Sequence, residues 1–250
     1  SPLEKELKDN GMEALYADME LPLCFTLYRM EKAGIAIDRS QLEQFGTMLA
    51  QRIADCEELI FSYSGGEFNI NSTKQLGELL FVILCLPPVK KTKTGYSTNA
   101  DVLEKLKNKH PIIPAIMDYR MLTKLKSTYA DGLMKVIEAD GRIRTTFQNL
   151  VTATGRLSST EPNLQNIPVR TDLGAEIRKM FIPSPGCVLV DADYSQIELR
   201  VLAHIAGDEN MQAAFNGGLD IHTATAAQVF GVEPENVTPL QRRNAKAVNF

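Results

Sequence analysis

The stretch from Asp191 to Arg200 reads DADYSQIELR and follows an apolar run from Cys187 to Val190. This order predicts a strand that carries acidic residues into a turn, with a helix beginning directly after it. Asp193 stands where its carboxylate could bind a metal ion, because magnesium prefers carboxylate oxygens. The N–H groups at the start of the helix would favour an anion such as a triphosphate. Those groups belong to Ser195, Gln196 and Ile197.

Each of these features also has a simpler explanation. Ser195-Gln-Ile-Glu198 fits a capping box, in which Glu198 would only close the start of the helix. Spacing alone likewise favours Asp193 as a residue that caps a turn at the end of a strand. Asp191 lies on the same strand face, two residues earlier. The residue pattern therefore leaves a structural and a catalytic interpretation open at this turn.

A second informative segment lies near the end of the chain, where Thr238-Pro239-Leu-Gln241 has the residues that begin a helix. In that helix Arg242, Lys246 and Phe250 are spaced four residues apart and share one face. Such a face could hold a triphosphate through the Arg fork and the Lys charge, while the ring stacks on a base or sugar. Taken alone, the pattern fits a solvated basic face that ends in a core phenylalanine better.

The chain has 250 residues, of which 44% are hydrophobic and 23% charged, as in an ordinary soluble globular protein. Its net charge of -4 means that any nucleic-acid binding must come from local basic clusters. The four cysteines form no CxxC pair, which gives no support to a zinc or redox motif and favours a reducing, cytoplasmic location. The charged start and the short apolar run from Leu79 to Leu86 predict neither secretion nor membrane insertion.

Helical periodicity dominates the first 138 residues. Capping residues and helix breakers predict helices at 11–32, 40–63, 72–86, 100–109 and 114–138. From Gly141 to Ser159 β-branched residues and glycines replace this period, which indicates strands and loops. A second strand pair is predicted at Ile177–Ile182 and Cys187–Asp193, and helices return from Ser195. The order of elements predicts an α+β architecture.

Three motifs together resemble those of the A-family DNA polymerases. DYSQIELR, at 193–200, resembles their nucleotide-binding motif, and RRNAKAVNF, at 242–250, resembles the opening of their fingers helix. TATGRLSSTEPNLQNIP, at 152–168, resembles their primer-template motif. The likeness can be followed from about Leu21 to Phe250. It implies part of a right-hand polymerase fold, with a lead-in helix (1–30), a thumb (31–138), the first part of the palm (139–207) and the first part of the fingers (208–250).

The resemblance implies roles for the residues of a nucleotide site. Asp193, with Tyr194 beside it, corresponds to the metal-binding position of the palm, and Glu198 to the residue that excludes a ribose 2′-hydroxyl. His222, in sequence terms an ordinary helix-start residue after the N-cap Asp220, corresponds to a triphosphate contact. The implied catalytic residues are Asp193 and Lys246. The implied nucleotide-binding residues are Ser195, Gln196, Ile197, Glu198, His222, Arg242, Lys246 and Phe250.

The same resemblance implies contacts to DNA. Arg156 would contact the primer terminus, and side-chain amides can bond the minor-groove acceptors that all base pairs share. The residues implied to contact the duplex are Asn163, Gln165 and Asn166. The implied thumb contacts to the phosphate backbone are Lys90, Lys91, Lys93, Ser97, Thr98, Asn99, Lys124, Lys126, Ser127 and Thr128. The simpler alternatives are a polar turn at 152–168 and ordinary surface charges for the lysines.

The implied function is template-directed DNA synthesis in replication and repair. Two magnesium ions would assist the attack of a primer 3′-hydroxyl on the α-phosphorus of a deoxynucleoside triphosphate. The family's second metal-binding motif, a His-Asp-Glu turn, does not occur in the 250 residues. We therefore expect the chain alone to be inactive and to associate with a second chain that carries the rest of the palm and fingers. Without that chain, unpaired strand edges and the apolar run at 81–88 favour aggregation.

Two other functions remain open on the sequence. A non-catalytic module that binds duplex DNA would use the thumb-like and primer-template segments without a metal site. A single-subunit RNA polymerase fits less well, because Glu198 would exclude its substrate. The sequence lacks the GxxxxGK[ST] loop, which argues against a P-loop ATPase or kinase.

Overall fold

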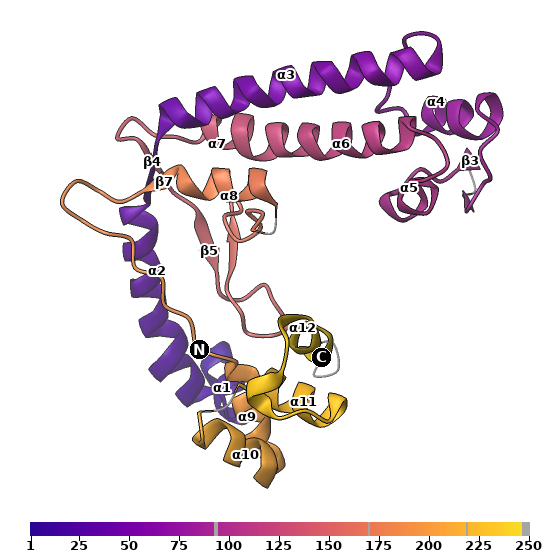
Figure 1. Ribbon diagram of the computed structural model, residues 1–250. Helices are drawn as coiled ribbons and strands as arrows, with labels where there is room; N and C mark the ends of the chain where they lie inside the picture. The colour runs from indigo at the N-terminus through magenta and orange to yellow at the C-terminus, as the bar shows by residue number, and fades with distance from the viewer. Residues whose placement is uncertain (93–94, 170, 219, 247–250) are drawn as a thin grey trace. The chain divides into compact units, whose positions relative to one another are not determined.

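The computed structural model describes residues 1–92, 95–169, 171–218 and 220–246 (Figure 1). The chain folds as two compact units, Ser1–Leu189 and Val190–Phe250. The boundary between them falls inside the predicted palm, 139–207, and the four-part division of the chain stays a prediction. Among the described residues, no helix combines the length and the apolar composition needed to cross a membrane.

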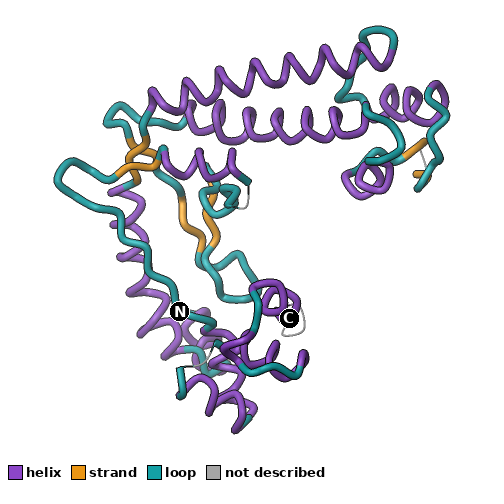
Figure 2. Tube along the Cα trace, viewed as in Figure 1, coloured by secondary structure: helices purple, strands orange, loops and turns teal. Residues whose placement is uncertain are grey.

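Helices make up most of the first unit (Figure 2). The α-helices are α1 (Pro2–Asp9), α2 (Leu21–Ala33), α3 (Arg39–Ser64), α4 (Thr73–Glu78), α5 (Ala100–Leu106), α6 (Ile112–Leu125), α7 (Asp131–Lys135) and α8 (Asp172–Lys179). Three π-helical turns continue or precede them: η1 (Leu15–Glu20), η2 (Leu79–Ile83) and η3 (Lys126–Ala130). The helices predicted before residue 138 are therefore present.

The two longest helices, α3 and α6, lie side by side and run in opposite directions (Figure 1). Leu42, Phe45 and Leu49 recur at helical spacing on α3 and are buried, so one face of the helix supplies core. Each such side chain contributes roughly 1.5–3 kcal/mol when it leaves water. Leu122 of α6 joins this cluster, and Ile60 near the other end of α3 belongs to a second cluster.

Side chains close to each helix start explain where several helices begin. Ser72 caps α4 by accepting from the N–H of Gln75 at 3.3 Å, as the sequence predicts. The predicted start of α3 at Ser40 is wrong, because Asp38 is the N-cap and accepts from the N–H of Gln41 at 3.0 Å. The carboxylate, placed two residues before Ser40, satisfies the first-turn donor instead. Gly65, in the left-handed conformation, ends α3 as expected.

Three small antiparallel sheets complete the first unit. The largest has the order β4-β1-β7, formed by Arg142–Ile143, Ile35–Ile37 and Phe181–Ile182. In it Ile35 pairs with Ile143 and Ala36 with Ile182. The other two are the hairpins β2 (Lys91–Thr92) with β3 (Gly95–Tyr96), and β5 (Thr146–Gln148) with β6 (Ser158–Thr160).

The predicted strand pair at 177–182 and 187–193 is largely wrong. Residues 172–179 form α8, capped by the Thr171 hydroxyl, which accepts from the N–H of Gly174 at 3.1 Å. Only Phe181–Ile182 is a strand. Residues 187–194 form no strand, and Val188 and Val190 are 79% and 82% exposed. A strand needs a hydrogen-bonded neighbour, and none of the described residues pairs with this segment.

The second unit is helical. Its elements are α9 (Ile197–Ala206), α10 (Glu209–Asn216), α11 (Ile221–Phe230), the 3₁₀ turn η4 (Pro234–Asn236) and α12 (Pro239–Lys246). Helices α11 and α12 lie against each other, and α9 lies against α10 (Figure 1). This unit contains all the residues predicted to bind metal and nucleotide, and one of them, Phe250, lies outside the described residues.

Candidate functional site

The turn before α9 differs from its predicted capping box. Gln196 is the N-cap, with φ of 53° and ψ of 40°, and no side chain caps the helix there. Because the left-handed residue moves the cap from Ser195 to Gln196, Glu198 is no longer three positions beyond the cap. The first-turn N–H groups consequently begin at Ile197, and those of Ser195 and Gln196 precede the helix. Glu198 therefore has no capping-box role.

Asp193 and Tyr194, the predicted metal-binding residues, are exposed on the extended segment before α9. A carboxylate in this position can supply the oxygen that a divalent cation requires. Within the described ranges, no three His, Cys, Asp or Glu residues lie close enough together to hold a metal ion. Asp193 can therefore supply one ligand to a divalent cation, and its role as a magnesium ligand stays a prediction.

Asp220, which the sequence identifies only as an N-cap, accepts hydrogen bonds from three residues of the second unit. It caps α11 through the N–H of Thr223 at 3.0 Å, which confirms that prediction. Its Oδ1 also accepts from Gln196 Nε2 at 2.8 Å and from Arg242 Nη2 at 3.1 Å. Arg242 Nε reaches Oδ2 at 2.7 Å, so the ion pair is bidentate.

The charge of Asp220 is stabilised by these donors. Hydrogen bonds from Arg242, and then from Thr223 and Gln196, hold the pKa of the Asp220 carboxyl well below its usual range. The contribution of this carboxylate to folding stability is therefore present above about pH 4, near the unfolded-state pKa, and is lost only as the pH falls through the lowered value. At neutral pH the Asp220–Arg242 pair is fully charged.

The start of α12 confirms the predicted capping box. The N–H of Gln241 donates to Thr238 Oγ1 at 3.3 Å, and the N–H of Thr238 donates back to Gln241 Oε1 at 2.9 Å. Arg242 and Lys246 consequently stand one turn apart on one helix. Lys246 is exposed, whereas Arg242 is turned toward Asp220. The predicted third member of the stripe, Phe250, lies outside the described residues.

His222, the predicted triphosphate contact, is the second residue of α11 and is only 4% exposed. Burial lowers its pKa from the ordinary value, and the charges of Arg242 and Lys246 lower it further against the opposing charge of Asp220. At neutral pH the imidazole is therefore neutral. If His222 contacts a phosphate, it does so as a hydrogen-bonding group rather than as a cation.

The primer-template segment, 152–168, belongs to the first unit and contains β6 with the turns on either side of it. Gln165 holds the β5–β6 hairpin through both ends of its amide: Nε2 donates to the carbonyl of Leu157 at 3.0 Å, and Oε1 accepts from the N–H of Ser159 at 3.3 Å. Asn163 Oδ1 accepts from the N–H groups of Gln165 and Asn166 at 3.0 and 3.2 Å. These amides build the polar turn that the sequence offers as the simpler alternative. Arg156, in contrast, is exposed.

In the predicted thumb segment 90–99, one side chain is buried. Thr98 is only 4% exposed, and Arg120 of α6 donates to its hydroxyl at 3.2 Å and to its carbonyl. Asn99 caps α5 by accepting from the N–H of Val102 at 3.0 Å. The Thr98 hydroxyl accepts a bond within the protein and is buried, so a phosphate contact would require this site to open to solvent. Sequence reasoning missed Arg120, which lies 22 residues from Thr98.

The three lysines of segment 90–99 differ in what the structure shows of them. Lys90 is exposed, and its carbonyl accepts from the N–H of Ser97 at 3.0 Å. Lys91 begins β2. Lys93 lies outside the described residues. Their predicted contacts to DNA stay predictions.

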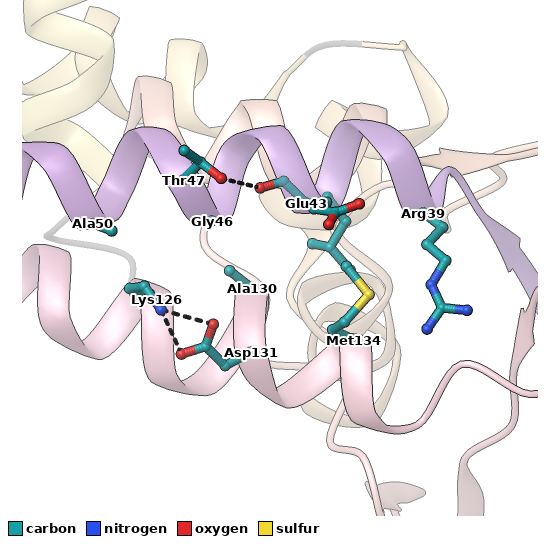
Figure 3. Close-up of a pocket in the computed structure, with 10 residues that line it drawn as sticks. Arg39, Glu43, Gly46, Thr47, Ala50, Lys126, Ala130, Asp131 and Met134 are labelled. Atoms are coloured by element: carbon teal, nitrogen blue, oxygen red, sulfur yellow. Dashed lines mark hydrogen bonds and ion pairs between the residues drawn. The ribbon is translucent and has the colours of Figure 1, made fainter.

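In the second thumb segment Lys126 is paired within the protein. Its Nζ lies 2.9 and 2.8 Å from the two oxygens of Asp131, one turn further along the helix (Figure 3). The pair borders a hollow of about 470 Å³ between α3 and the η3–α7 helix. Lys124, Ser127 and Thr128 are exposed and remain accessible. The sequence does not reveal the Lys126–Asp131 pair, because the intervening π-helical turn alters the spacing of the side chains.

Comparison with known proteins decides the family. Residues 39–250 match DNA polymerase family A. The chain belongs to that family. It is similar to DNA polymerase I of Caldicellulosiruptor bescii, with 54% identity over 242 residues that cover 96% of this chain and 28% of the relative. It is 53% identical to DNA polymerase I of Geobacillus stearothermophilus over 251 residues, which cover 100% of this chain and 29% of the relative.

A solved structure shows the fold. The family A chain superimposes with a TM-score of 0.88 on the POL domain of Pol1 from M. smegmatis, solved in complex with a DNA primer-template and dNTP. The two are 45% identical, and the match covers 99% of this chain and 44% of that chain. The predicted right-hand polymerase fold, mostly helical with a few antiparallel strands, is therefore confirmed. The chain spans only 28–29% of the length of the two polymerase I relatives.

Within the second unit of this family A chain, several residues predicted to bind nucleotide lie close together. Gln196, the α11 start that carries His222, and Arg242 are joined through Asp220. The residues predicted to contact DNA belong to the first unit, on several separate elements. The roles of all these residues in binding and catalysis stay predictions.

Proposed function

We propose that this chain is part of a DNA polymerase that extends a primer 3′-hydroxyl with deoxynucleoside triphosphates along a template, in replication and repair. The observation that carries the proposal is the likeness to a POL domain that was solved with a primer-template and dNTP. In the second unit, Arg242 and Lys246 stand one turn apart beside the start of α11, and a triphosphate requires cations of this kind. The free state of all four cysteines supports a cytoplasmic location.

The proposed reaction uses two magnesium ions. Asp193, with Tyr194 beside it, would hold one side of the metal site, and its exposed carboxylate fits a hard cation. When bound, the ions neutralise charge that develops on the reacting phosphate. The described residues offer no group of three metal ligands around Asp193. We therefore propose that the 250 residues alone do not extend a primer, and that the family's other carboxylate motif is needed to complete the site.

Contacts to the primer-template are proposed for the first unit. Arg156 is exposed and has the charge and the donors to bind the primer terminus. Asn163, Gln165 and Asn166 lie in the adjoining polar turn, where their hydrogen bonds fix its shape. We propose that this shaped turn, rather than each free amide, faces the duplex. Lys90 and Lys124 are the exposed thumb lysines proposed to contact phosphates.

A primer-extension assay tests the proposed function. The purified chain alone is expected to give no extension, and to bind duplex DNA weakly with an affinity that falls steeply as salt rises. Addition of a polypeptide that carries the rest of a family A palm and fingers is expected to restore extension. Extension by the chain alone would contradict the proposed metal site. Duplex binding without extension in the completed assembly would favour the alternative, a non-catalytic duplex-binding module.

The Glu198→Ala substitution tests the proposed sugar selectivity. Glu198 is the second residue of α9 and has no capping-box role, so its removal is not expected to cost the roughly 1 kcal/mol of a lost helix cap. In the complete polymerase we expect Glu198→Ala to admit ribonucleotides more readily, while deoxynucleotide use changes less. Steady-state incorporation of matched ribo- and deoxynucleotides gives the ratio of deoxynucleotide to ribonucleotide use in each protein. Unchanged sugar discrimination would contradict the steric role.

A further inference from the structure

One carboxylate in the second unit accepts more hydrogen bonds than a helix cap requires. To cap α11, Asp220 needs only the N–H of Thr223, 3.0 Å from Oδ2. It also accepts from the Thr223 hydroxyl at 2.7 Å, from Gln196 at 2.8 Å, and from two nitrogens of Arg242 at 2.7 and 3.1 Å. Gln196 and Arg242 are 24 and 22 residues away in sequence. These bonds therefore join separate segments of the unit.

Gln196, the first of these partners, has an unusual backbone. Its left-handed conformation, φ 53° and ψ 40°, is rare for residues other than glycine and occurs at the step from the Asp193 turn into α9. Its Nε2 donates to Asp220, whereas its buried Oε1 accepts no hydrogen bond from the described residues. Asp220 is thus the group that orients the Gln196 amide. A conformation of this kind persists only where neighbouring contacts hold it.

Arg242, the second partner, is held along one edge. Asp220 engages Nε and Nη2, and the planar guanidinium has five N–H donors in a rigid fork. The other edge, with the Nη1 donors and the second Nη2 donor, can still bind a phosphate. Because the side chain is already ordered, less rotamer freedom is lost when it binds an anion. The ion pair thereby prepares Arg242 for a ligand.

We propose that Asp220 is a positioning residue of the nucleotide site: it joins the turn at Gln196 to Arg242 and so fixes the metal side of the site relative to the phosphate side. The inference rests on the proposed function, in which Asp193 binds metal and Arg242 binds triphosphate. Helix α11, which Asp220 caps, lies against α12, which carries Arg242 (Figure 1). Asp220 itself acts through its partners and does not contact the nucleotide.

The Asp220→Asn substitution distinguishes the bonds of Asp220 to Gln196 and Arg242 from its role as the N-cap of α11. Asn caps a helix about as well as Asp, so α11 is expected to keep its start. Its amide, however, has one oxygen and one NH₂ group. With the oxygen at the cap, in place of Oδ2, the NH₂ replaces Oδ1 and faces Gln196 Nε2 and Arg242 Nη2. Asp208→Asn is the matched control, because Asp208 caps α10 through the N–H of Met211 at 2.8 Å and forms no ion pair with the described residues.

Two measurements are made on the whole chain: the affinity for inorganic tripolyphosphate and for a deoxynucleoside triphosphate, and amide hydrogen exchange at residues 194–199. We expect Asp220→Asn to weaken tripolyphosphate binding about tenfold and to speed exchange in this turn about tenfold, because Gln196 loses its acceptor and Arg242 loses the negative charge and the Nη2 bond, keeping only the bond from Nε. Asp208→Asn is expected to change the tripolyphosphate affinity and the exchange rate by less than about twofold each. In an Arg242→Ala background, Asp220→Asn is expected to weaken binding by less than a further factor of about two.

Several results would overturn the proposal. Wild-type affinity of Asp220→Asn for tripolyphosphate is one. Another is an equal loss of affinity on Asp220→Asn with Arg242 present and with Arg242 replaced by Ala, because it would indicate a general loss of stability. Circular dichroism checks that the helices persist, and Asp220→Ser, whose hydroxyl also caps, replaces any variant that does not fold. If the wild-type chain binds neither probe, the nucleotide part of the proposed function is wrong. The exchange measurement then still decides whether Asp220 holds the Gln196 turn: faster exchange in the variant supports the link, and unchanged exchange overturns it.

Discussion

Replacement of Asp193 by Ala in the complete polymerase is expected to lower nucleotide incorporation about 10³-fold or more, while duplex affinity stays within about twofold of wild type. Asp193 is exposed on a segment without regular structure, so its removal is not expected to disturb the fold. Its proposed partner is a divalent cation, and the loss of a metal ligand removes several kcal/mol of stabilisation from the charged transition state. Single-turnover kinetics give the incorporation rate, and a binding titration gives the duplex affinity.

Asp191 provides a matched control for this prediction. It is also an exposed aspartate on the same segment, two residues earlier, and falls outside the family's core motif. Asp191→Ala removes the same charge and is expected to keep incorporation near wild type. A similar loss in both variants would indicate a general electrostatic effect, and near wild-type incorporation by Asp193→Ala would refute the assignment of Asp193 as a metal ligand.

The sequence predicts best those helix starts whose capping residue and first turn are neighbours in the chain. Ser72, Asp220 and Thr238 each cap the helix that follows, because the donor and the acceptor lie three residues apart and fold together. The start of α3 shows the limit of this reasoning. Asp38 and Ser40 are both good caps, and only the fold decides that Asp38 accepts the bond.

Strands are predicted less well, because a strand depends on a partner that can lie far away in sequence. β1, for example, pairs with β4 and β7, which are more than 100 residues further along the chain. The apolar run from Cys187 to Val190 fits a strand pattern but pairs with none of the described residues. The pattern gives a preference for extended backbone, and the partner decides whether a strand forms.

The candidate site was predictable in its residue types but not in its contacts. The motifs identify Gln196 and Arg242, yet nothing local indicates that Asp220 joins them, since each lies more than 20 residues away. The pairing of Lys126 with Asp131 is similarly hidden by a π-helical turn, which departs from the usual helical register. Side-chain chemistry is therefore readable from the sequence, whereas the choice among competing partners requires the folded chain.

Lys246→Ala is expected to lower incorporation by the complete polymerase about 10²- to 10³-fold with little change in duplex affinity. Lys246 is exposed on α12, one turn from Arg242, and its charge reaches His222, whose pKa it helps to lower. The charge of Arg242 is already paired with that of Asp220 within the protein. Removal of Lys246 therefore takes away one positive charge beside the start of α11.

Lys246→Arg distinguishes the two ways in which Lys246 can assist. Arginine keeps the positive charge but does not release a proton under these conditions, whereas lysine can supply either charge or a proton to the leaving phosphates. If charge dominates, Lys246→Arg is expected to recover most of the rate that Lys246→Ala loses. If proton donation dominates, both variants are expected to be similarly slow and the wild-type rate to depend on pH in a way that Lys246→Arg does not share. Wild-type incorporation by Lys246→Ala would refute both roles, and with them the proposed grip of α12 on the triphosphate.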